Sequence, residues 1–367
     1  MTQDRGAQDA KAIFADELRP IRPTDDQWWA AKFNDKEFYF DSGFVIRAVA
    51  ETGEDVHFWS IMYHQKCNDV IIHCDLTQTV LLVTKFSEDE KKHMHATRFI
   101  DLGQNVEDFL PLGSFKVTET SKGAKWEAAG REFLSEPPHW YIRGEHAGVK
   151  TDLHLFNPSD GFFHLGLFEN WKPDGSAGYQ THLRAEGTIE YEGRKLRIKG
   201  WAVHENLGFR GTTMGIPNRI GYMGDQGLYW AHGFSDEFSW YILSGHAERN
   251  ATGMVVIDGK TIHATGQSNV WVETIKEWID PESNQLVPCK WRTYLRAPEG
   301  LLETYCHSYS RTYYTWNRLG GVIVVYHLVG EAEATFTHAD GRVLKAPKQL
   351  FFTEFMRTLT RRNKLIN

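Results

Sequence analysis

The sequence predicts an all-β protein in which antiparallel strands build two domains. Segments with alternating apolar and polar residues recur from residue 37 to residue 338, as expected for strands with one buried face. Turn signals such as residues 157–161 (Asn-Pro-Ser-Asp-Gly) separate these segments, and helical periodicity is almost absent between them. A single core stops growing beyond roughly 250 to 300 residues, so a chain of 367 residues predicts two domains. Aromatic residues make up 13% of the chain, which also favours strands.

Helices are predicted only near the two ends of the chain. In an N-terminal arm, residues 1–35, the alanine-rich segment over residues 7–18 predicts a short helix. Asp25 and Asp26 follow it and predict a helix cap ahead of an aromatic anchor. Apolar residues at helical spacing predict a closing helix over residues 347–367. These apolar residues are Leu350, Phe351, Phe355 and Leu359.

The strands between these ends divide into a first domain, residues 36–210, and a second domain, residues 211–346. The division falls within residues 211–218, where glycine and proline interrupt the alternating pattern. In the first domain, strands are expected to start near Phe38 and to follow at 56–63, 70–74, 79–86, 96–102, 113–119, 124–128, 139–145, 151–156 and 161–168, with a further one from Leu196. In the second domain they are expected at 227–234, 237–248, 253–258, 261–266, 268–279, 289–297, 301–309, 321–329 and 332–338.

Composition excludes several classes of function. The net charge is −7 without a basic block, whereas nucleic-acid binding needs clustered Lys and Arg. Four cysteines without CxxC spacing predict a reduced, cytoplasmic protein. The N-terminus shows no secretory signal pattern. No apolar run approaches the ~20 residues that span a bilayer, so stable membrane insertion is not expected. The sequence does not set the oligomeric state.

Cofactor and metal motifs are also missing from the sequence. No glycine pair is followed by a helical pattern, so the dinucleotide and phosphate-loop fingerprints are absent. No Gly-x-Ser-x-Gly elbow occurs. His93 and His95 resemble the HxH pair of a metal site on a strand, but the expected glutamate does not follow in residues 96–99. We therefore expect neither an organic cofactor nor a metal.

One stretch, residues 196–210, concentrates polar residues at the end of an apolar strand. Leu196, Ile198 and Ala202 share one face of this strand. Continuing the count places His204 on the same apolar face and Glu205 on the opposite face. A bulge at Gly200 would shift the register by one residue and turn Glu205 inward instead. In either register, one of the two side chains is expected beside Trp230 or Trp240.

Other polar and aromatic residues are expected to gather near the same place. Alternation puts Trp230 and His232 on one face of their strand. His57 and Trp59 likewise share a face of an earlier strand, and His64 lies on its other face. The residues expected to line a binding site are Tyr229, Trp230, His232, Trp240 and Trp59, with His64 and Asp75 as further candidates.

The run Gly-Trp-Ala-x-His-Glu-Asn-x-Gly-x-Arg, residues 200–210, follows a glycine hairpin and a basic strand and precedes aromatic strands. In this order it resembles the hydroxyneurosporene synthase (carotenoid 1,2-hydratase) superfamily. That family carries an Asp-His-Asn/Ser-Trp-Gly-x-Arg-like run at this place. The matching positions here are Asn206, Gly208 and Arg210. His204 and Glu205 stand where Asp-His is usual, and Leu207 replaces the usual Trp.

The resemblance implies two lipocalin-like β-barrels in tandem over residues 36 to about 345, and it implies chemistry of the kind that hydrates or cyclises alkenes. Protonating an alkene requires an acid kept neutral by an apolar environment. The resulting carbocation is stabilised by the faces of Trp or Tyr rings. In this hypothesis the acid–base residues are His204, Glu205 and Asn206, with Arg210 as a charge partner.

The resulting hypothesis is a cofactor-independent hydratase, dehydratase or cyclase for an apolar isoprenoid, polyketide or phenolic substrate. An alternative is a carrier that sequesters an apolar small molecule without chemistry, since such barrels do this readily. A perturbed carboxylate at Glu205, or a contact of His204 with a carboxylate, would favour the enzyme. A purely apolar lining would favour the carrier. A metal-dependent enzyme that uses some of the histidines is a third alternative.

Overall fold

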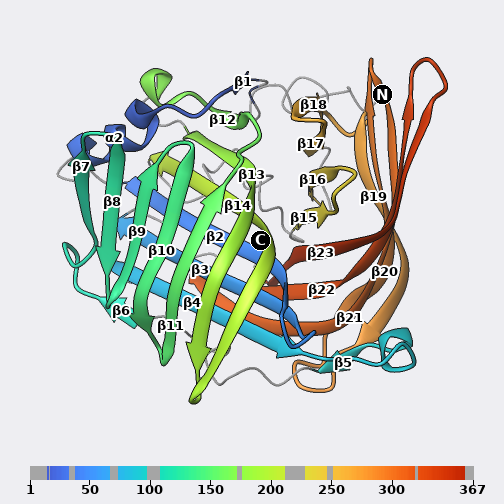
Figure 1. The fold of residues 1–367 in the computed structure, drawn as a ribbon, viewed down its shortest axis with the longest axis horizontal. Helices are drawn as coiled ribbons and strands as arrows, with labels where there is room; N and C mark the ends of the chain where they lie inside the picture. The colour runs from blue at the N-terminus through green and yellow to red at the C-terminus, as the bar shows by residue number, and fades with distance from the viewer. Residues whose placement is uncertain are drawn as a thin grey trace, which may run out of the picture.

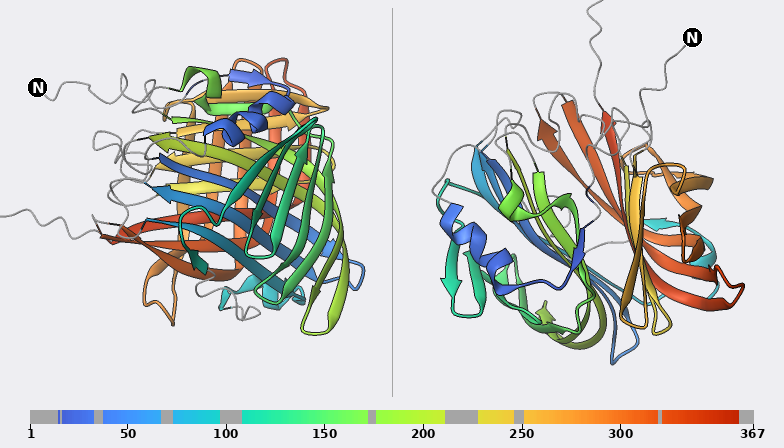
Figure 2. Two further views of the ribbon diagram at one scale, coloured as in Figure 1. Left: turned by 90° about the vertical axis from the view of Figure 1, so that its left-hand side faces the viewer. Right: turned by 90° about the horizontal axis from the view of Figure 1, so that it is seen from above.

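Two curved antiparallel sheets make up the computed structural model, which describes residues 15, 17–32, 38–66, 73–96, 108–171, 176–210, 228–245, 251–318 and 321–359. Each sheet is curled into a half-barrel, and the two stand side by side (Figures 1 and 2). This confirms the predicted all-β class with two lipocalin-like halves. No helix in the described part of the chain is long and apolar enough to cross a membrane.

The first sheet runs in the order β6-β4-β3-β2-β14-β13-β11-β10-β9-β8-β7, with β12 beside β13 and β1 beside β12. Its strands are β1 (Glu17–Arg19), β2 (Phe38–Ala50), β3 (Asp55–Lys66), β4 (Cys74–Thr84), β6 (Asp108–Leu110), β7 (Lys116–Thr120), β8 (Gly123–Ala128), β9 (Arg131–Glu136), β10 (His139–His146), β11 (Val149–Phe156), β12 (Gly161–Gly166), β13 (Ser176–Tyr191) and β14 (Arg194–Arg210). Helix α2 (Pro23–Lys32) contacts β7 and β8, and the short 3-10 helix η2 (Phe168–Asn170) follows β12.

The second sheet runs in the order β18-β17-β16-β15-β23-β22-β21-β20-β19. Its strands are β15 (Leu228–Phe234), β16 (Ser239–Gly245), β17 (Ala251–Ile257), β18 (Lys260–Thr265), β19 (Val270–Ile279), β20 (Leu286–Ala297), β21 (Gly300–Arg318), β22 (Gly321–His338) and β23 (Val343–Leu359). Two short elements that follow β4 also contact the second sheet. They are the 3-10 helix η1 (Glu90–Lys92) and β5 (His95–Ala96), and β5 pairs in parallel with β21.

Three apolar clusters follow from this arrangement. One fills the inner face of the first sheet and another the inner face of the second. The third lies between the sheets and joins side chains such as Trp59 and Val203 to Trp230 and Phe352. We call this third region the junction. Arg47, which is fully buried, donates from Nε to the Phe351 carbonyl across it at 2.9 Å.

The predicted C-terminal helix over residues 347–367 is wrong, because β23 continues as a strand to Leu359 and residues 360–367 lie outside the described part. Phe351 and Phe355 of β23 pack inside the second sheet, whereas Phe352 and Met356 pack in the junction. A strand that is buried on both faces loses its polar alternation, and its apolar run then imitates helical spacing.

At the N-terminus, residues 7–14 of the predicted helix lie outside the described residues, and residues 17–19 form β1. The helix that the structure does show, α2, begins at Pro23 and carries Asp25 and Asp26 in its first turn. The change from the first sheet to the second occurs between Arg210 and Leu228. Residues 211–227, which include the predicted boundary, lie outside the described part.

Candidate active site at the junction of the two sheets

Strand β14 takes part in two sites because its two faces meet different surroundings. It pairs without interruption with β13 on one side and β2 on the other, so no bulge occurs at Gly200. A side chain at Gly200 would be blocked, since a Cβ there would lie 2.3 Å from the Arg47 carbonyl oxygen. The unshifted register is therefore the correct one: His204 faces the inside of the first sheet, and Glu205 faces the junction.

Glu205 belongs to a group of carboxylates in the junction. It lies beside Gly43 of β2, and the carboxylates of Asp41 and Glu354 both act on it. Removal from water, together with these two like charges, raises the pKa of Glu205 well above its ordinary value. Its side chain is only partly buried, so this acid remains accessible.

Glu354 of β23 is the second acid and comes from the facing sheet. It is 4% exposed, and burial raises its pKa from 4.5 to about 8, although a hydrogen bond from Tyr314 Oη at 2.9 Å opposes the rise. A carboxyl group with this pKa is predominantly protonated at pH 7. Glu354 therefore supplies a neutral carboxylic acid, a state that favours proton donation, and the raised pKa of Glu205 shifts that group in the same direction.

A chain of polar groups extends behind Glu354. His327, opposite Glu354 in the β22–β23 register, places Nε2 3.4 Å from Tyr314 Oη and 4.0 Å from Glu354 Oε1. Its Nδ1 lies 3.1 Å from Nε2 of His57 on the first sheet. Burial lowers the pKa of His327 to about 3 and that of His57 well below 6.5, so both rings are neutral. This chain can exchange protons with Glu354 while carrying no fixed charge.

Aromatic rings lie near Glu354 on the junction side. Trp230 pairs with Glu354 in the β15–β23 register, and its ring centroid lies 6.1 Å from that of Trp59 in a perpendicular arrangement. Trp59 also approaches the ring of His327 at 4.9 Å. The structure thus brings together four predicted residues: Glu205, Trp230, His232 and Trp59.

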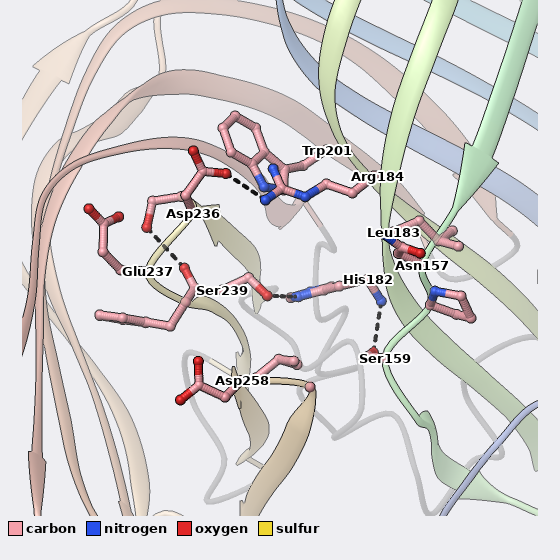
Figure 3. Close-up of a pocket in the computed structure, with 15 residues that line it drawn as sticks. Asn157, Ser159, His182, Leu183, Arg184, Trp201, Asp236, Glu237, Ser239 and Asp258 are labelled. Carbon is pink, nitrogen blue, oxygen red and sulfur yellow. Dashed lines mark hydrogen bonds and ion pairs between the residues drawn. The ribbon is translucent and has the colours of Figure 1, made fainter.

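His232 leads from this group to a pocket at another part of the junction. Its Nδ1 lies 3.0 Å from His182 Nε2, and His182 Nδ1 lies 2.7 Å from Ser239 Oγ. The pocket has a volume of about 490 Å³, within the range of small-molecule sites, and both sheets contribute to its lining. Figure 3 shows His182 directed at Ser239, and Arg184 paired with Asp236 across the two domains.

His204 and Asn206, the other predicted acid–base residues, lie on the opposite side of β14. His204 is fully buried, stacks on Phe44 at a centroid distance of 4.3 Å, and has its pKa lowered by burial to about 3. It therefore lies beside Phe44, Trp140 and Tyr179 and not beside Trp230 or Trp240. A neutral imidazole with so low a pKa has one N–H donor and one acceptor nitrogen, and it is a poor general acid.

Asn206 contacts a buried carboxylate that the sequence did not reveal as a site residue. Asp26 of α2 accepts hydrogen bonds from Asn206 Nδ2 at 2.7 Å and Tyr179 Oη at 2.8 Å, and from the Ser135 hydroxyl. Burial raises the pKa of Asp26 from 3.8 to about 7, against the effect of these three donors. The predicted catalytic residues are thus divided between two acidic centres on the two faces of one strand.

The remaining predicted residues lie elsewhere. His64 Nδ1 and Asp75 Oδ1 are 2.6 Å apart, and Asp75 also accepts backbone hydrogen bonds from Gly113 and Phe115, so the pair joins strands of the first sheet. Tyr229 and Trp240 pack inside the second sheet, away from the junction. The side chain of Arg210 lies outside the described part, so its predicted role stays a prediction.

Sequence reasoning missed Glu354, Tyr314 and His327 as site residues. Glu354 stood within the segment interpreted as a helix, and nothing in its neighbourhood indicated a partner 40 residues earlier. A signal was present, because Glu354 is the single charged residue within the apolar run 350–356. Among the described residues, no group of three or more His, Cys, Asp or Glu side chains is arranged to hold a metal ion. Independence from metals and cofactors stays a prediction.

Comparisons with known proteins relate this chain to others through its fold. No protein-family sequence model matches it, and no curated protein matches it in sequence. Among solved structures, kievitone hydratase from Nectria haematococca matches with a TM-score of 0.51 and 10% identity, over 88% of this chain and 89% of that one. CghA in complex with Sch210972 matches with a TM-score of 0.54 and 9% identity, over 88% and 89% of the two chains. A protein assigned as AttH from Nitrosomonas europaea matches with a TM-score of 0.50 and 14% identity, over 86% and 91%.

These matches extend over most of both chains, so the arrangement of two sheets is common to all of them. They show that this chain shares the two-sheet fold of kievitone hydratase and CghA, which is the fold that the resemblance of residues 200–210 implied.

Proposed function

We propose that the protein is a lyase or isomerase that donates a proton to an apolar small molecule at the junction, to an alkene as a hydratase or cyclase, or to a leaving hydroxyl group as a dehydratase. The observation that carries this proposal is the pair of carboxyl groups, Glu205 and Glu354, which the two sheets bring into interaction and whose pKa values are both raised, with Trp230 beside Glu354. The fold shared with kievitone hydratase agrees with this class of reaction.

The reaction needs only these groups and, for hydration, water. The carboxylic acid of Glu354 transfers its proton to one alkene carbon, whose π electrons form the new C–H bond, and the other carbon becomes a cation. The electron-rich faces of Trp230 and Trp59 stabilise that cation. Water then adds to the cation and returns a proton to the carboxylate, which gives hydration. Alternatively, a second alkene of the substrate adds to the cation, and a C–H proton next to the new cation returns to the Glu354 carboxylate, which gives cyclisation.

Each acid has a distinct part in this scheme. Glu354 is buried and in contact with Tyr314 and His327, so it can be reprotonated through that chain. Glu205 is partly accessible, and its pKa is raised in part by Glu354. When one of the two ionises, the like charge disfavours ionisation of the other, so one proton remains available. A carrier would not need acids in this state, which favours the enzyme over the carrier.

A substrate is first sought by native mass spectrometry of molecules that co-purify with the protein and by assays on a panel of isoprenoid, polyketide and phenolic alkenes. The turnover of that substrate by variants then tests the proposal. Glu354→Gln and Glu205→Gln preserve shape and hydrogen bonding but carry no transferable proton. Each is expected to lower turnover by on the order of 10²–10⁴, the usual worth of a general acid. Glu303→Gln, an exposed glutamate on β21, is the matched control and should match the parent. Unchanged turnover in both acid variants would refute the assignment.

A further inference from the structure

The inside of the first sheet holds a second polar group, independent of the proposed reaction at the junction. It is built around Asp26, whose carboxylate receives three side-chain hydrogen bonds. The donors are widely separated in sequence: Ser135 is on β9, Tyr179 on β13 and Asn206 on β14. All of these side chains are fully buried. A network of this kind fixes the orientation of each member.

That fixed orientation leaves two acceptors unused. The amide nitrogen of Asn206 is committed to Asp26, so its Oδ1 points elsewhere and has no hydrogen-bond partner among the described residues. His204 Nδ1 lies 3.0 Å from the Gly43 carbonyl oxygen, which can only accept, so Nδ1 carries the proton. His204 Nε2 is then an acceptor, and it too has no partner in the described part of the chain.

Donor groups of the same kind lie next to these acceptors. Trp140, whose ring centroid is 5.8 Å from that of His204 and which pairs with Ser135, has an Nε1–H without a described partner. The hydroxyl of Ser42, directly opposite Asn206 in the β2–β14 register, is also unpartnered within the described residues. Both side chains are fully buried. Buried polar groups are normally hydrogen-bonded, so four such atoms on side chains that are neighbours in the sheet register or in ring contact point to a ligand.

We propose that this interior is a binding site for a small neutral molecule that carries a hydroxyl group on a flat apolar body. A hydroxyl donates one hydrogen bond and accepts others, which matches an acceptor such as His204 Nε2 and a donor such as Trp140 Nε1. The rings of Phe44, Trp140 and Tyr179 contact the His204 ring and make its surroundings flat and apolar. Asp26 is a positioning residue here, since it acts through the amide of Asn206.

The site calls for a ligand without a full charge. Its free groups include both acceptors and donors. An ammonium ion only donates and would leave Trp140 Nε1–H unmatched, and a carboxylate only accepts and would leave His204 Nε2 unmatched. Phenol is therefore the simplest probe with the required chemistry. Its binding can be measured by isothermal titration calorimetry without knowledge of any substrate.

Three substitutions separate the proposal from a purely structural role. Ser42→Ala removes an unpartnered hydroxyl and His204→Phe removes the acceptor while keeping a flat ring; each should weaken phenol binding by roughly tenfold, the worth of one hydrogen bond. Thr312→Val, which removes a buried hydroxyl of the second sheet that likewise has no partner among the described residues, should leave the affinity unchanged. Because Ser42→Ala removes no hydrogen bond within the described structure, it should fold like the parent.

A spectroscopic signature completes the test. In the parent protein, the indole N–H resonance of Trp140, assigned with Trp140→Phe, should shift on addition of phenol and saturate with the calorimetric affinity. Glu354→Gln should bind phenol normally, so failure of the junction proposal would not affect this result. The inference is wrong if phenol does not bind saturably, if Ser42→Ala and His204→Phe bind it like the parent, or if the Trp140 resonance does not move. It is also wrong if a crystal structure with phenol shows only water beside Asn206.

Discussion

The pH dependence of stability gives a test of Glu354 that needs no substrate. Glu354 has an ordinary pKa of 4.5 when exposed and about 8 in the folded protein. Between these two values the folded state holds a proton that the unfolded state releases, so raising the pH favours unfolding. This contribution is absent below pH 4.5, grows by ~1.4 kcal/mol per pH unit, and reaches ~5 kcal/mol above pH 8.

Glu354→Gln isolates that contribution, because glutamine is uncharged at every pH and can still accept the hydrogen bond from Tyr314. We expect parent and variant to agree within ~1 kcal/mol at pH 4.5, the worth of a typical hydrogen bond. At pH 8 to 9 the variant should be more stable by several kcal/mol, up to ~5 kcal/mol. The measurement is urea unfolding followed by fluorescence at a series of pH values.

Glu303→Gln serves as the control, since that side chain is exposed and its removal should leave the pH profile unchanged. If the parent and Glu354→Gln lose stability in parallel from pH 5 to 9, Glu354 is not a buried neutral acid. The same result would remove the main support for proton donation at the junction.

Two further predictions concern other buried groups. Burial lowers the pKa of His164 from 6.5 to about 4, so the folded state favours the neutral ring. The free energy of unfolding should be constant above pH 6.5 and fall by up to ~3 kcal/mol as the pH drops to 4. His164→Phe should lack this fall in acid unfolding curves, and an unchanged acid limb would contradict the assignment. Arg47 joins the sheets through the Phe351 carbonyl and pairs with Asp55, so Arg47→Met should lower the free energy of unfolding by ~3–5 kcal/mol in urea titrations. A loss below ~1 kcal/mol would show that this buried pair does not hold the junction.

Much of the local structure was predictable because a strand repeats every two residues. Alternation correctly placed His204 inward and Glu205 outward, and it correctly put Trp230 and His232 on one face. It could not show that both faces of β14 are buried, one inside the first sheet and one against the second. The residues that the sequence assigned to a single site therefore lie in two separate centres.

Partners from distant segments were not predictable. Asp26 had the pattern of a helix cap, but its contacts to Tyr179 and Asn206 span 153 and 180 residues. Glu354 was hidden in an apolar run that imitates a helix, because β23 is buried on both faces. Long-range pairing depends on how the two sheets meet, and no single segment of the sequence contains that information.

The most direct test of the central claim is the infrared spectrum of the carboxyl groups at pH 7, measured on the parent protein and on Glu205→Gln and Glu354→Gln. A neutral carboxylic acid shows a carbonyl stretching band that an ionised carboxylate lacks. We expect the parent to show this band for both glutamates, and each substitution to remove its own contribution. Difference spectra without a lost carboxylic acid band would mean that both glutamates are ionised, and they would contradict acid catalysis at the junction.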